Sequence, residues 1–287
     1  MEALARRFGR VFDEVAAEYD RSRPTYPDEL VAHACRLAGL GSGDRVLEVG
    51  CGTGQLTRSL VAHGLHVTAI EQGGRLISLA EQRLGGHGAV EFVNARFEDV
   101  PVPHGHFEAV FSAAAFHWLD PDVSWEKVAR ALVPGGTLAL IQYCALQDPR
   151  SSRDDEELLA ALARVAPELA VDWPPTRDLA TLAAGVEERR ENVSEAWAWL
   201  AHQDVARGYA GDLFCDVQIA SVPVLLEQTG EELNALLRTA SFYHRLAPNQ
   251  RQALERKHVE LYEELGRPIR SSMVAILLTA RRGAELS

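Results

Sequence analysis

Short apolar runs alternate with amphipathic stretches between residues 44 and 144. Each run is too short for a helix and rich in β-branched or bulky side chains, and the spans between runs are long enough for crossover helices. The runs lie at 45–49, 66–70, 90–93, 108–111 and 137–141. Between them, residues 55–63 and 74–84 carry apolar side chains at helical spacing. This alternation predicts a parallel sheet covered by helices on both faces.

The pattern changes after residue 150. Residues 151–190 are rich in Ala, Leu, Glu and Arg, with breaks at Pro167 and at Pro174-Pro175, which predicts two or three helices. Pro223 in the next apolar run indicates an edge strand or an irregularity, and Thr229 begins a capping-box-like sequence. The expected elements are a strand at 214–226, helices at 229–242 and 248–266, and a closing strand at 272–280. We therefore expect one sheet with helices inserted near its end, as a lid over a ligand crevice.

Acidic residues outnumber basic ones in this chain. The sequence holds 41 Asp and Glu against 29 Lys and Arg, which gives a net charge of −12. Such a surface repels nucleic acid and anionic membranes, so neither is expected as a partner. No run approaches the roughly 18 apolar residues of a membrane span, and the stretch from Met1 to Arg10 is charged and has no apolar run. We expect a cytoplasmic protein without a secretory signal.

The spacing of cysteine and histidine gives no sign of a metal site. The four cysteines form no CxxC pair, and the ten histidines form no HExxH motif or close cluster. Cys51 lies in a glycine-rich segment without a partnered histidine nearby in sequence. A small residue in a tight loop is therefore the simpler interpretation of Cys51 than a nucleophile, and no metal is expected.

The most informative segment joins the first expected strand to the first expected helix. It reads Val46-Leu47-Glu48-Val49-Gly50-Cys51-Gly52-Thr53-Gly54-Gln55. Glycines let the chain turn tightly and bring its backbone against a ligand without an intervening Cβ. The helix start behind the turn offers unpaired N–H groups and a positive dipole end, which suit a carboxylate or a phosphate.

Glycine spacing separates the candidate ligands. A dinucleotide-binding GxGxxG motif would need glycine where this chain has Gln55, and no Gly-Lys-Ser/Thr of a P-loop follows. Glu71 ends the second expected strand, where a carboxylate can accept hydrogen bonds from two ribose hydroxyls. The alternative for Glu71 is a solvated strand end. The turn together with Glu71 predicts a cofactor that carries a ribose.

These residues resemble those of class I methyltransferases that depend on S-adenosylmethionine (SAM), in the branch that includes trans-aconitate methyltransferase-like proteins. The matching segments are Leu47 to Gly54, Glu71, Phe97-Glu98-Asp99-Val100-Pro101, Phe116-His117-Trp118 and Leu132-Val133-Pro134-Gly135-Gly136-Thr137, with Phe12-Asp13, Tyr19-Asp20 and Arg23-Pro24-Thr25-Tyr26-Pro27 near the start. One position departs from the pattern. Arg96 stands where relatives often carry an Asp bound to the adenine amino group, and arginine cannot accept a hydrogen bond.

The resemblance implies a Rossmann-like class I methyltransferase fold, which is an α/β fold with a mostly parallel seven-stranded sheet and an inserted helical lid. N-terminal helices within residues 1–40 would close over the cofactor, and residues 41–145 would form the SAM-binding core. Residues 146–270 would supply the lid, the sixth strand and the substrate region. Residues 271–287 would supply the last strand.

The resemblance also assigns cofactor contacts. They would come from Arg23, Glu48, Gly50, Cys51, Gly52, Thr53, Gly54, Glu71, Gln72, Phe97 and Glu98. Glu48 would anchor the turn, and the turn would wrap the methionine part of SAM. Glu71 would hold the ribose, with Gln72, Phe97 and Glu98 around the adenine. Arg23 would reach the SAM carboxylate, or equally pair with a surface acid.

Methyl transfer from a sulfonium is an in-line displacement, so the enzyme mainly aligns the acceptor and excludes water. A base is needed only where the acceptor must lose a proton. His117 is the candidate base because it follows the strand whose end faces the crevice, and Tyr19 is a second candidate for moving a proton. The alternative is that both only pack the cofactor pocket. Tyr26, Phe116 and Trp118 are candidate substrate contacts.

Aromatic residues of the expected lid suit a flat or apolar acceptor. They are Trp173, Trp197, Trp199, Tyr209, Phe242, Tyr243 and His244. Trp197 and Trp199 are two positions apart, so a helix cannot present both on one face. At least one of them is expected to pack elsewhere.

We therefore expect a SAM-dependent methyltransferase that acts on a small organic molecule, such as a specialised metabolite, at O, N or C and releases S-adenosylhomocysteine. One alternative is a carboxylate O-methyltransferase of the trans-aconitate type, favoured if Arg21, Arg23 or Arg207 points into the pocket. A second is a protein that binds SAM without methyl transfer. A nicotinamide oxidoreductase is disfavoured by Gln55, and a nucleic-acid methyltransferase by the net charge. A monomer or a homodimer is expected.

Overall fold

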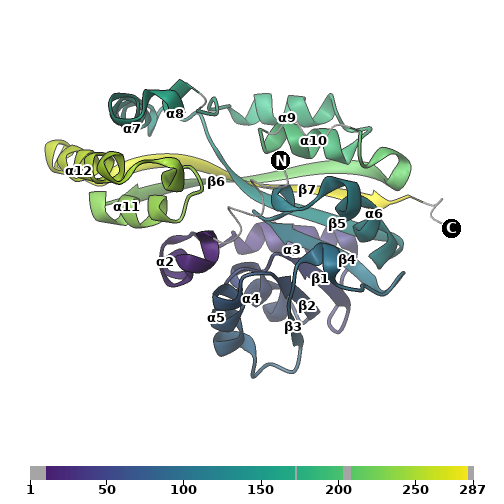
Figure 1. The fold of residues 1–287 in the computed structure, drawn as a ribbon. Helices are drawn as coiled ribbons and strands as arrows, with labels where there is room; N and C mark the ends of the chain where they lie inside the picture. The colour runs from purple at the N-terminus through teal and green to yellow at the C-terminus, as the bar shows by residue number, and fades with distance from the viewer. Residues whose placement is uncertain (1–10, 172, 203–207, 284–287) are drawn as a thin grey trace.

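A seven-stranded sheet organises the chain in the computed structural model, which describes residues 11–171, 173–202 and 208–283 (Figure 1). The strands are β1 (Arg45–Val49), β2 (His66–Glu71), β3 (Val90–Asn94), β4 (Phe107–Ala113), β5 (Leu132–Ala145), β6 (Phe214–Gln228) and β7 (Ile269–Arg282). Their order is β3-β2-β1-β4-β5-β7-β6. The first five pair in parallel, whereas β7 runs antiparallel to β5 and β6. The predicted mostly parallel α/β sheet is confirmed, and β6, with Pro223, lies at an edge of it.

Helices cover both faces of this sheet. They are α2 (Ala16–Ser22), α3 (Asp28–Ala38), α4 (Gln55–Ala62), α5 (Gly74–Leu84), α6 (Pro121–Ala131), α7 (Ser152–Val165), α8 (Pro167–Val171), α9 (Leu179–Glu187), α10 (Val193–Leu200), α11 (Gly230–Arg238) and α12 (Pro248–Leu265). Successive strand residues face opposite sides, so Leu138 of β5 joins the hydrophobic cluster that holds Trp125 of α6. Its neighbour Ala139 joins the cluster that holds Leu56 of α4. In the described part of the chain, none of these helices is both long and apolar enough to cross a membrane.

The last three strands are much longer than the others. β5, β6 and β7 have 14, 15 and 14 residues, whereas β1 to β4 have five to seven. At roughly 3.3 Å per residue, the long strands reach about 20 Å or more beyond the short ones. Figure 1 shows this extension running toward α7, α11 and α12. The extra strand length therefore gives the lid helices a platform beside the core.

The structure divides the region in which the lid is expected. α9 and α10 contribute Leu182, Val186 and Trp197 to a cluster of the main core, so they cover the sheet itself. The sequence pattern does not predict α10. α7, α8, α11 and α12 instead form the lid, where Leu162 and Leu254 share a separate cluster. Two groups of helices thus occupy the region in which the lid is expected, and the closing role of α7, α8, α11 and α12 stays a prediction.

α11 ends at Arg238, four residues before the predicted end near Phe242. The Thr239 hydroxyl donates to the Leu236 carbonyl at 2.6 Å, and the Arg23 guanidinium donates to the Thr239 carbonyl at 2.7 Å. Carbonyls that would continue the helix are therefore satisfied by side chains. One of those side chains comes from the other end of the sequence.

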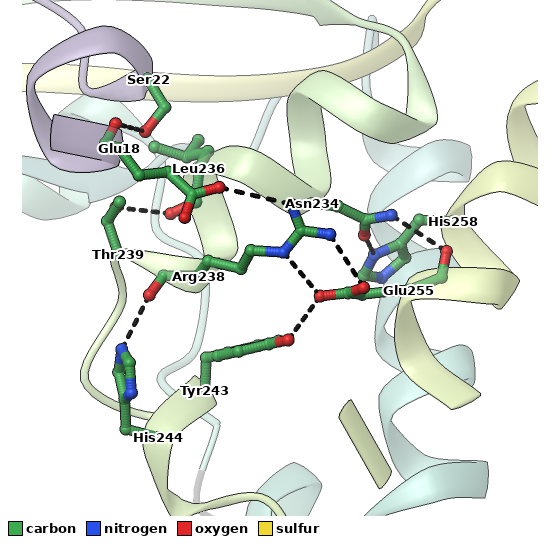
Figure 2. Close-up of polar contacts among 10 residues, drawn as sticks. All are labelled: Glu18, Ser22, Asn234, Leu236, Arg238, Thr239, Tyr243, His244, Glu255 and His258. Atoms are coloured by element: carbon green, nitrogen blue, oxygen red, sulfur yellow. Dashed lines mark hydrogen bonds and ion pairs between the residues drawn. The ribbon is translucent and has the colours of Figure 1, made fainter. Parts of the chain in front are cut away.

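The segment around α2 connects the core to the lid. On the core side, the Asp13 carboxylate accepts from the backbone N–H groups of Arg75, at 2.6 Å, and Leu76, at 3.2 Å, in the first turn of α5. On the lid side, Arg238 of α11 lies 3.3 Å from the Glu18 carboxylate, as Figure 2 shows. These contacts place α2 beside the cavity described next.

Candidate functional site

One large cavity, of about 1240 Å³, lies at the carboxyl ends of the central strands. Val49 of β1, Ile70 of β2 and Ala113 of β4 line it. The strand order changes direction between β1 and β4, and open α/β sheets bind their ligands at such a switch point. The cavity extends under the lid to α7, α11 and α12. Its volume exceeds the roughly 300–1,000 Å³ of ordinary ligand pockets, so it has room for two ligands.

The glycine turn adopts a backbone that side chains oppose. Gly50, Gly52 and Gly54 have φ of 76°, 57° and 87°, in the left-handed region. A Cβ on Gly50 would lie 2.3 Å from the Ala115 Cβ, far inside a normal carbon contact. The Gly50 N–H donates to the Ile70 carbonyl at 2.8 Å, which ties the turn to β2. The turn therefore requires glycine for two reasons. Its backbone has positive φ, and Gly50 lies too close to Ala115 to carry a Cβ.

Only part of the predicted turn faces the cavity. Gly50 and Gly52 line it, whereas Cys51 and Thr53 are buried beneath the turn. Gly54 packs on α5, where a Cβ would lie 3.3 Å from Ala80. Cys51, Thr53 and Gly54 are not lining residues, so the structure gives no support to their expected cofactor contacts.

Glu48 also lies behind the turn, away from the cavity lining. Its carboxylate is 1% exposed and accepts a hydrogen bond from the Thr57 hydroxyl of α4 at 2.6 Å. Burial raises the pKa of Glu48 to about 7, and the Thr57 bond opposes this shift. Glu48 thus joins β1 to α4, as the anchoring role expected of it requires, without contacting the cavity itself.

Glu71 lies at the end of β2 and lines the cavity. Its two carboxylate oxygens accept the backbone N–H groups of Gly52, at 3.0 Å, and Gly73, at 2.7 Å. Burial raises the pKa of Glu71, while these two hydrogen bonds lower it. A carboxylate has about four acceptor sites, so two remain for hydroxyl groups of a ligand. The geometry fits the ribose contact that the sequence predicts.

Gln55, which breaks the dinucleotide-binding glycine motif, also contributes a side-chain amide to the cavity. It is the first residue of α4 and lines the cavity beside Gly52. Its buried Nε2 has no hydrogen-bond partner among the residues that the structure describes. An unpaired amide donor at a helix start suits a carboxylate such as that of methionine. These observations fit SAM at this end of the cavity.

The residues expected around the adenine lie together. Gln72, Phe97 and Glu98 all line the cavity. Lys127 of α6 holds this segment, because its Nζ donates to the carbonyls of Phe97 and, at 2.9 Å, Glu98. Arg96 also lines the cavity, and its guanidinium lies 3.6 Å from the Glu98 carboxylate. Arg96 is therefore neutralised by a neighbour at this end of the site.

Arg23 does not have the partner expected of it. Its Nε donates to the Thr239 hydroxyl at 2.8 Å, and its guanidinium lies 5.2 Å from the centre of the Tyr19 ring. The Thr239 hydroxyl and the Thr239 carbonyl both accept hydrogen bonds from Arg23. The guanidinium therefore holds α2 to the lid. Arg23 lines the cavity while two of its N–H groups bind Thr239, and its expected contact with the SAM carboxylate stays a prediction.

The residues after β4 separate into two groups. His117 and Trp118 line the cavity. Phe116 is buried and packs edge-on against Trp125, with ring centroids 4.6 Å apart. Phe116 is not a lining residue, so the structure gives no support to its expected substrate contact. A single turn of 3₁₀ helix points adjacent side chains in different directions, so only two of the three aromatic residues can face the ligand.

The candidate bases differ in environment. Burial and the nearby charge of Arg23 lower the pKa of His117 to about 4, so its imidazole is neutral at pH 7. Tyr19 and Tyr26 line the cavity near it. Tyr26 stacks on Tyr143 with centroids 5.7 Å apart, and burial raises its phenol pKa well above the ordinary value. His117 and Tyr26 are therefore uncharged at neutral pH, and the catalytic roles of His117 and Tyr19 stay predictions.

Comparison with known proteins agrees with this geometry. A family model described as a methyltransferase domain matches residues 47–140, from β1 into β5. A demethylmenaquinone methyltransferase of Clavibacter sepedonicus is 30% identical over 168 residues, which cover 56% of this chain and 69% of that protein. The chain belongs to the class I SAM-dependent methyltransferases.

Other relatives of this methyltransferase extend the comparison. An uncharacterized methyltransferase of Mycobacterium tuberculosis is 32% identical over 171 residues, which cover 60% of this chain and 63% of that protein. The match thus spans less than two thirds of the mycobacterial relative. A solved structure from Anaeromyxobacter dehalogenans, described as a type II methyltransferase, has a TM-score of 0.58 and 20% identity over 90% of this chain and 97% of its own. It shows the same fold, and the cofactor of the family is SAM.

The methyltransferase lid supplies the second half of the cavity. Its floor consists of residues from the extended strands: Gln142, Tyr143, Ala145, Leu226, Gln228, Ser271, Ser272 and Met273. Of the aromatic residues expected there, Trp173, Tyr209 and Phe242 line it. Trp197 is buried in the core, and Trp199 lies under the Arg177 guanidinium, 4.0 Å from its centre. The two tryptophans therefore face different surroundings, as predicted.

His258 makes the stability of the methyltransferase sensitive to acid. Burial lowers its pKa to about 4, so below pH 6.5 the unfolded chain binds a proton that the folded chain does not. Stability from this group is complete above pH 6.5 and is lost as the pH falls toward 4. Between pH 6.5 and 4.5 we expect the free energy of unfolding to fall by about 2 kcal/mol more in the wild type than in His258→Phe.

Urea unfolding at several pH values checks this prediction. The slopes with pH are compared, because the substitution also removes a hydrogen bond and shifts the whole curve. The raised pKa of Glu48 makes the free energy of unfolding rise as the pH falls, which is opposite to the effect of His258. Glu48 contributes equally in the wild type and the variant, so its effect cancels in the comparison. Equal slopes in wild type and variant would contradict a neutral, buried His258.

Proposed function

We propose that this methyltransferase transfers the methyl group of SAM to a small, uncharged and largely apolar organic acceptor held in the lid half of the cavity. The observation that carries the proposal is the single cavity of about 1240 Å³, which joins the glycine turn and Glu71 to an apolar chamber under the lid. Bound SAM supplies an electrophilic methyl group. Two ligands that share one cavity can be aligned with each other, which is the main requirement of the reaction.

The charges in the cavity disfavour an anionic acceptor. Among the described lining residues, Arg23 and Arg96 carry the only guanidinium or ammonium groups. Two N–H groups of Arg23 bind Thr239, and Arg96 lies beside Glu98 and Asp99. A carboxylate acceptor would need an unoccupied arginine to orient it.

The carboxylate O-methyltransferase of the trans-aconitate type therefore has less support. Arg21 is not a lining residue, and Arg207 lies outside the described residues. The demethylmenaquinone methyltransferase among the relatives is named for an apolar substrate, which supports an acceptor of that polarity here.

The residues of this chain would bind SAM and orient the acceptor, because SAM itself supplies the reactive methyl group. Glu71 would hold the ribose hydroxyls, and the Gln55 amide would donate to the methionine carboxylate. Tyr19, Tyr26, His117 and Trp118 line the region between the turn and the lid chamber. The neutral His117 can accept a proton from an acidic acceptor such as a phenol, although a pKa of about 4 makes it a weak base.

Calorimetric titration with SAM and, separately, NADH tests the cofactor half of the proposal. We expect micromolar SAM binding and no NADH binding. Turnover of SAM to S-adenosylhomocysteine is then measured with matched phenols, aryl amines and aryl carboxylates. We expect turnover with uncharged acceptors only. Turnover confined to carboxylates would support the trans-aconitate type of reaction, and SAM binding without turnover would support a non-catalytic role.

A further inference from the structure

The lid chamber contains one buried imidazole that the proposed reaction does not use. His258 of α12 is 2% exposed and lines the cavity. The lining side chains of α7, α11 and α12 are mostly leucines, with Ser152, Asp155 and Glu156 at the start of α7. The leucines are Leu158, Leu159, Leu162, Leu233, Leu236, Leu237 and Leu254. A polar group in an apolar wall costs free energy unless a partner satisfies it. The state of this imidazole therefore bears on what the chamber can hold.

The hydrogen bonds of Asn234 fix the orientation of its amide. One amide atom lies 3.1 Å from the Glu255 backbone carbonyl, which can only accept, so that atom is the donating Nδ2 (Figure 2). The other is then Oδ1, which can only accept, and it lies 2.8 Å from His258 Nδ1. His258 Nδ1 therefore carries the hydrogen of this bond.

The second ring nitrogen is consequently an acceptor. Burial lowers the pKa of His258 to about 4, so at neutral pH the ring holds a single proton, on Nδ1. Nε2 then presents a lone pair, and no residue that the structure describes makes a hydrogen bond to it. In an apolar wall this lone pair is suited to a donor on a bound ligand.

The surrounding network holds the Asn234–His258 pair in place. Arg238 of α11 donates to both carboxylate oxygens of Glu255 on α12, at 2.8 and 2.9 Å, and the Tyr243 hydroxyl donates to the same carboxylate (Figure 2). α11 and α12 are thus joined one turn away from His258. A preorganised acceptor loses little freedom when it binds a ligand, which favours selectivity.

We propose that His258 is a specificity-determining residue of the lid chamber, where its Nε2 accepts a hydrogen bond from a hydroxyl group on an uncharged, largely apolar acceptor. The inference rests on the proposed function, because it takes the lid chamber to be the acceptor site. The hydroxyl need not be the methylated group. His258 recognises one hydroxyl group of the acceptor, and the leucines around His258 accommodate the apolar remainder of the molecule.

A pair of probes that differ in one group tests this inference. 2-Naphthol and 2-methylnaphthalene have nearly the same shape, but only the first donates a hydrogen bond. Their binding to protein saturated with S-adenosylhomocysteine is measured by fluorescence, with 2-naphthoate as an anionic third probe. We expect the wild type to bind 2-naphthol about fivefold more tightly than 2-methylnaphthalene, and to bind 2-naphthoate most weakly.

His258→Phe should abolish the preference for 2-naphthol while both hydrocarbon rings still bind. His244→Phe is the matched control, because the His244 ring bonds the Arg238 carbonyl on the same lid and does not line the cavity. It should retain the fivefold preference. Calorimetry with S-adenosylhomocysteine shows for each variant that the cofactor half is intact.

Two results would overturn the inference. One is equal binding of the two probes by the wild type, and the other is a preference that survives in His258→Phe. Loss of S-adenosylhomocysteine binding in the wild type would instead reject the proposed function. The cofactor titration and the probe ratio therefore report the two failures separately.

Discussion

Gly50→Ala is expected to weaken SAM binding at least a hundredfold. Alanine at a φ of 76° costs about 1–2 kcal/mol. Its Cβ would also lie 2.3 Å from the Ala115 Cβ, so the turn or the segment after β4 must move by more than 1 Å. Both segments line the cavity, and the Gly50 N–H bond to the Ile70 carbonyl is made from the same turn. A displaced turn no longer presents its backbone to the ligand.

Two further glycines separate a cofactor effect from a folding effect. A Cβ on Gly52 would meet only the Gln55 and Tyr19 side chains, at 3.8 and 3.9 Å, so Gly52→Ala keeps the strain of a positive φ without the clash and intrudes on the cavity. Gly86→Ala places its Cβ in open space and should change nothing. Calorimetry and thermal melts of all three should rank the loss of SAM binding as Gly50, then Gly52, then Gly86. Unchanged SAM binding in Gly50→Ala would mean that the turn does not hold the cofactor.

Glu71→Ala is expected to weaken SAM binding about thirtyfold, or roughly 2 kcal/mol. The free acceptor sites of this carboxylate face the cavity, and hydrogen bonds to a charged acceptor are stronger than neutral ones. The substitution also leaves the N–H groups of Gly52 and Gly73 without their acceptors, so the turn itself loosens. Calorimetric titration with SAM measures the loss.

Glu108→Ala is the matched control for Glu71. Glu108 is also a strand glutamate, and its carboxylate accepts the Arg45 N–H at 2.8 Å, but it lies at the amino end of the sheet. Its removal should lower the melting temperature modestly and leave SAM affinity unchanged. If Glu71→Ala weakens SAM binding no more than Glu108→Ala, the ribose role of Glu71 is wrong.

The N-terminal segment contributes to the site in a way that bears on both experiments. Asp13 caps α5, while Glu18 and Arg23 bond α11, so α2 is held between the two halves of the cavity. Arg23, which the resemblance assigns to SAM, is one of two links to the lid, and its contact with SAM stays a prediction. That this segment closes over the cofactor stays a proposal, supported by the lining position of Tyr19.

Local signals in the sequence were sufficient for the core. The strands and the two crossover helices follow from periodicity. Each forms within a short stretch, and the spacing of apolar residues in that stretch indicates which face is buried. The turn and Glu71 were found for the same reason: strand, glycines and helix start are contiguous in the chain. α10 also had such a signal, since Asn192 caps its first turn by accepting the Ser194 N–H at 2.9 Å.

Only the tertiary structure decided which residues face the ligand. Phe116 and His117 are adjacent, yet one packs in the core and the other lines the cavity, and no periodicity predicts this in a short 3₁₀ turn. Arg23 finds its partner at Thr239, 216 residues away. His258 reaches the chamber because long strands carry α12 back beside the core. The sequence by itself determined the fold and the glycine turn, whose contacts are local, whereas the part of the cavity under α7, α11 and α12 is made by contacts between distant segments.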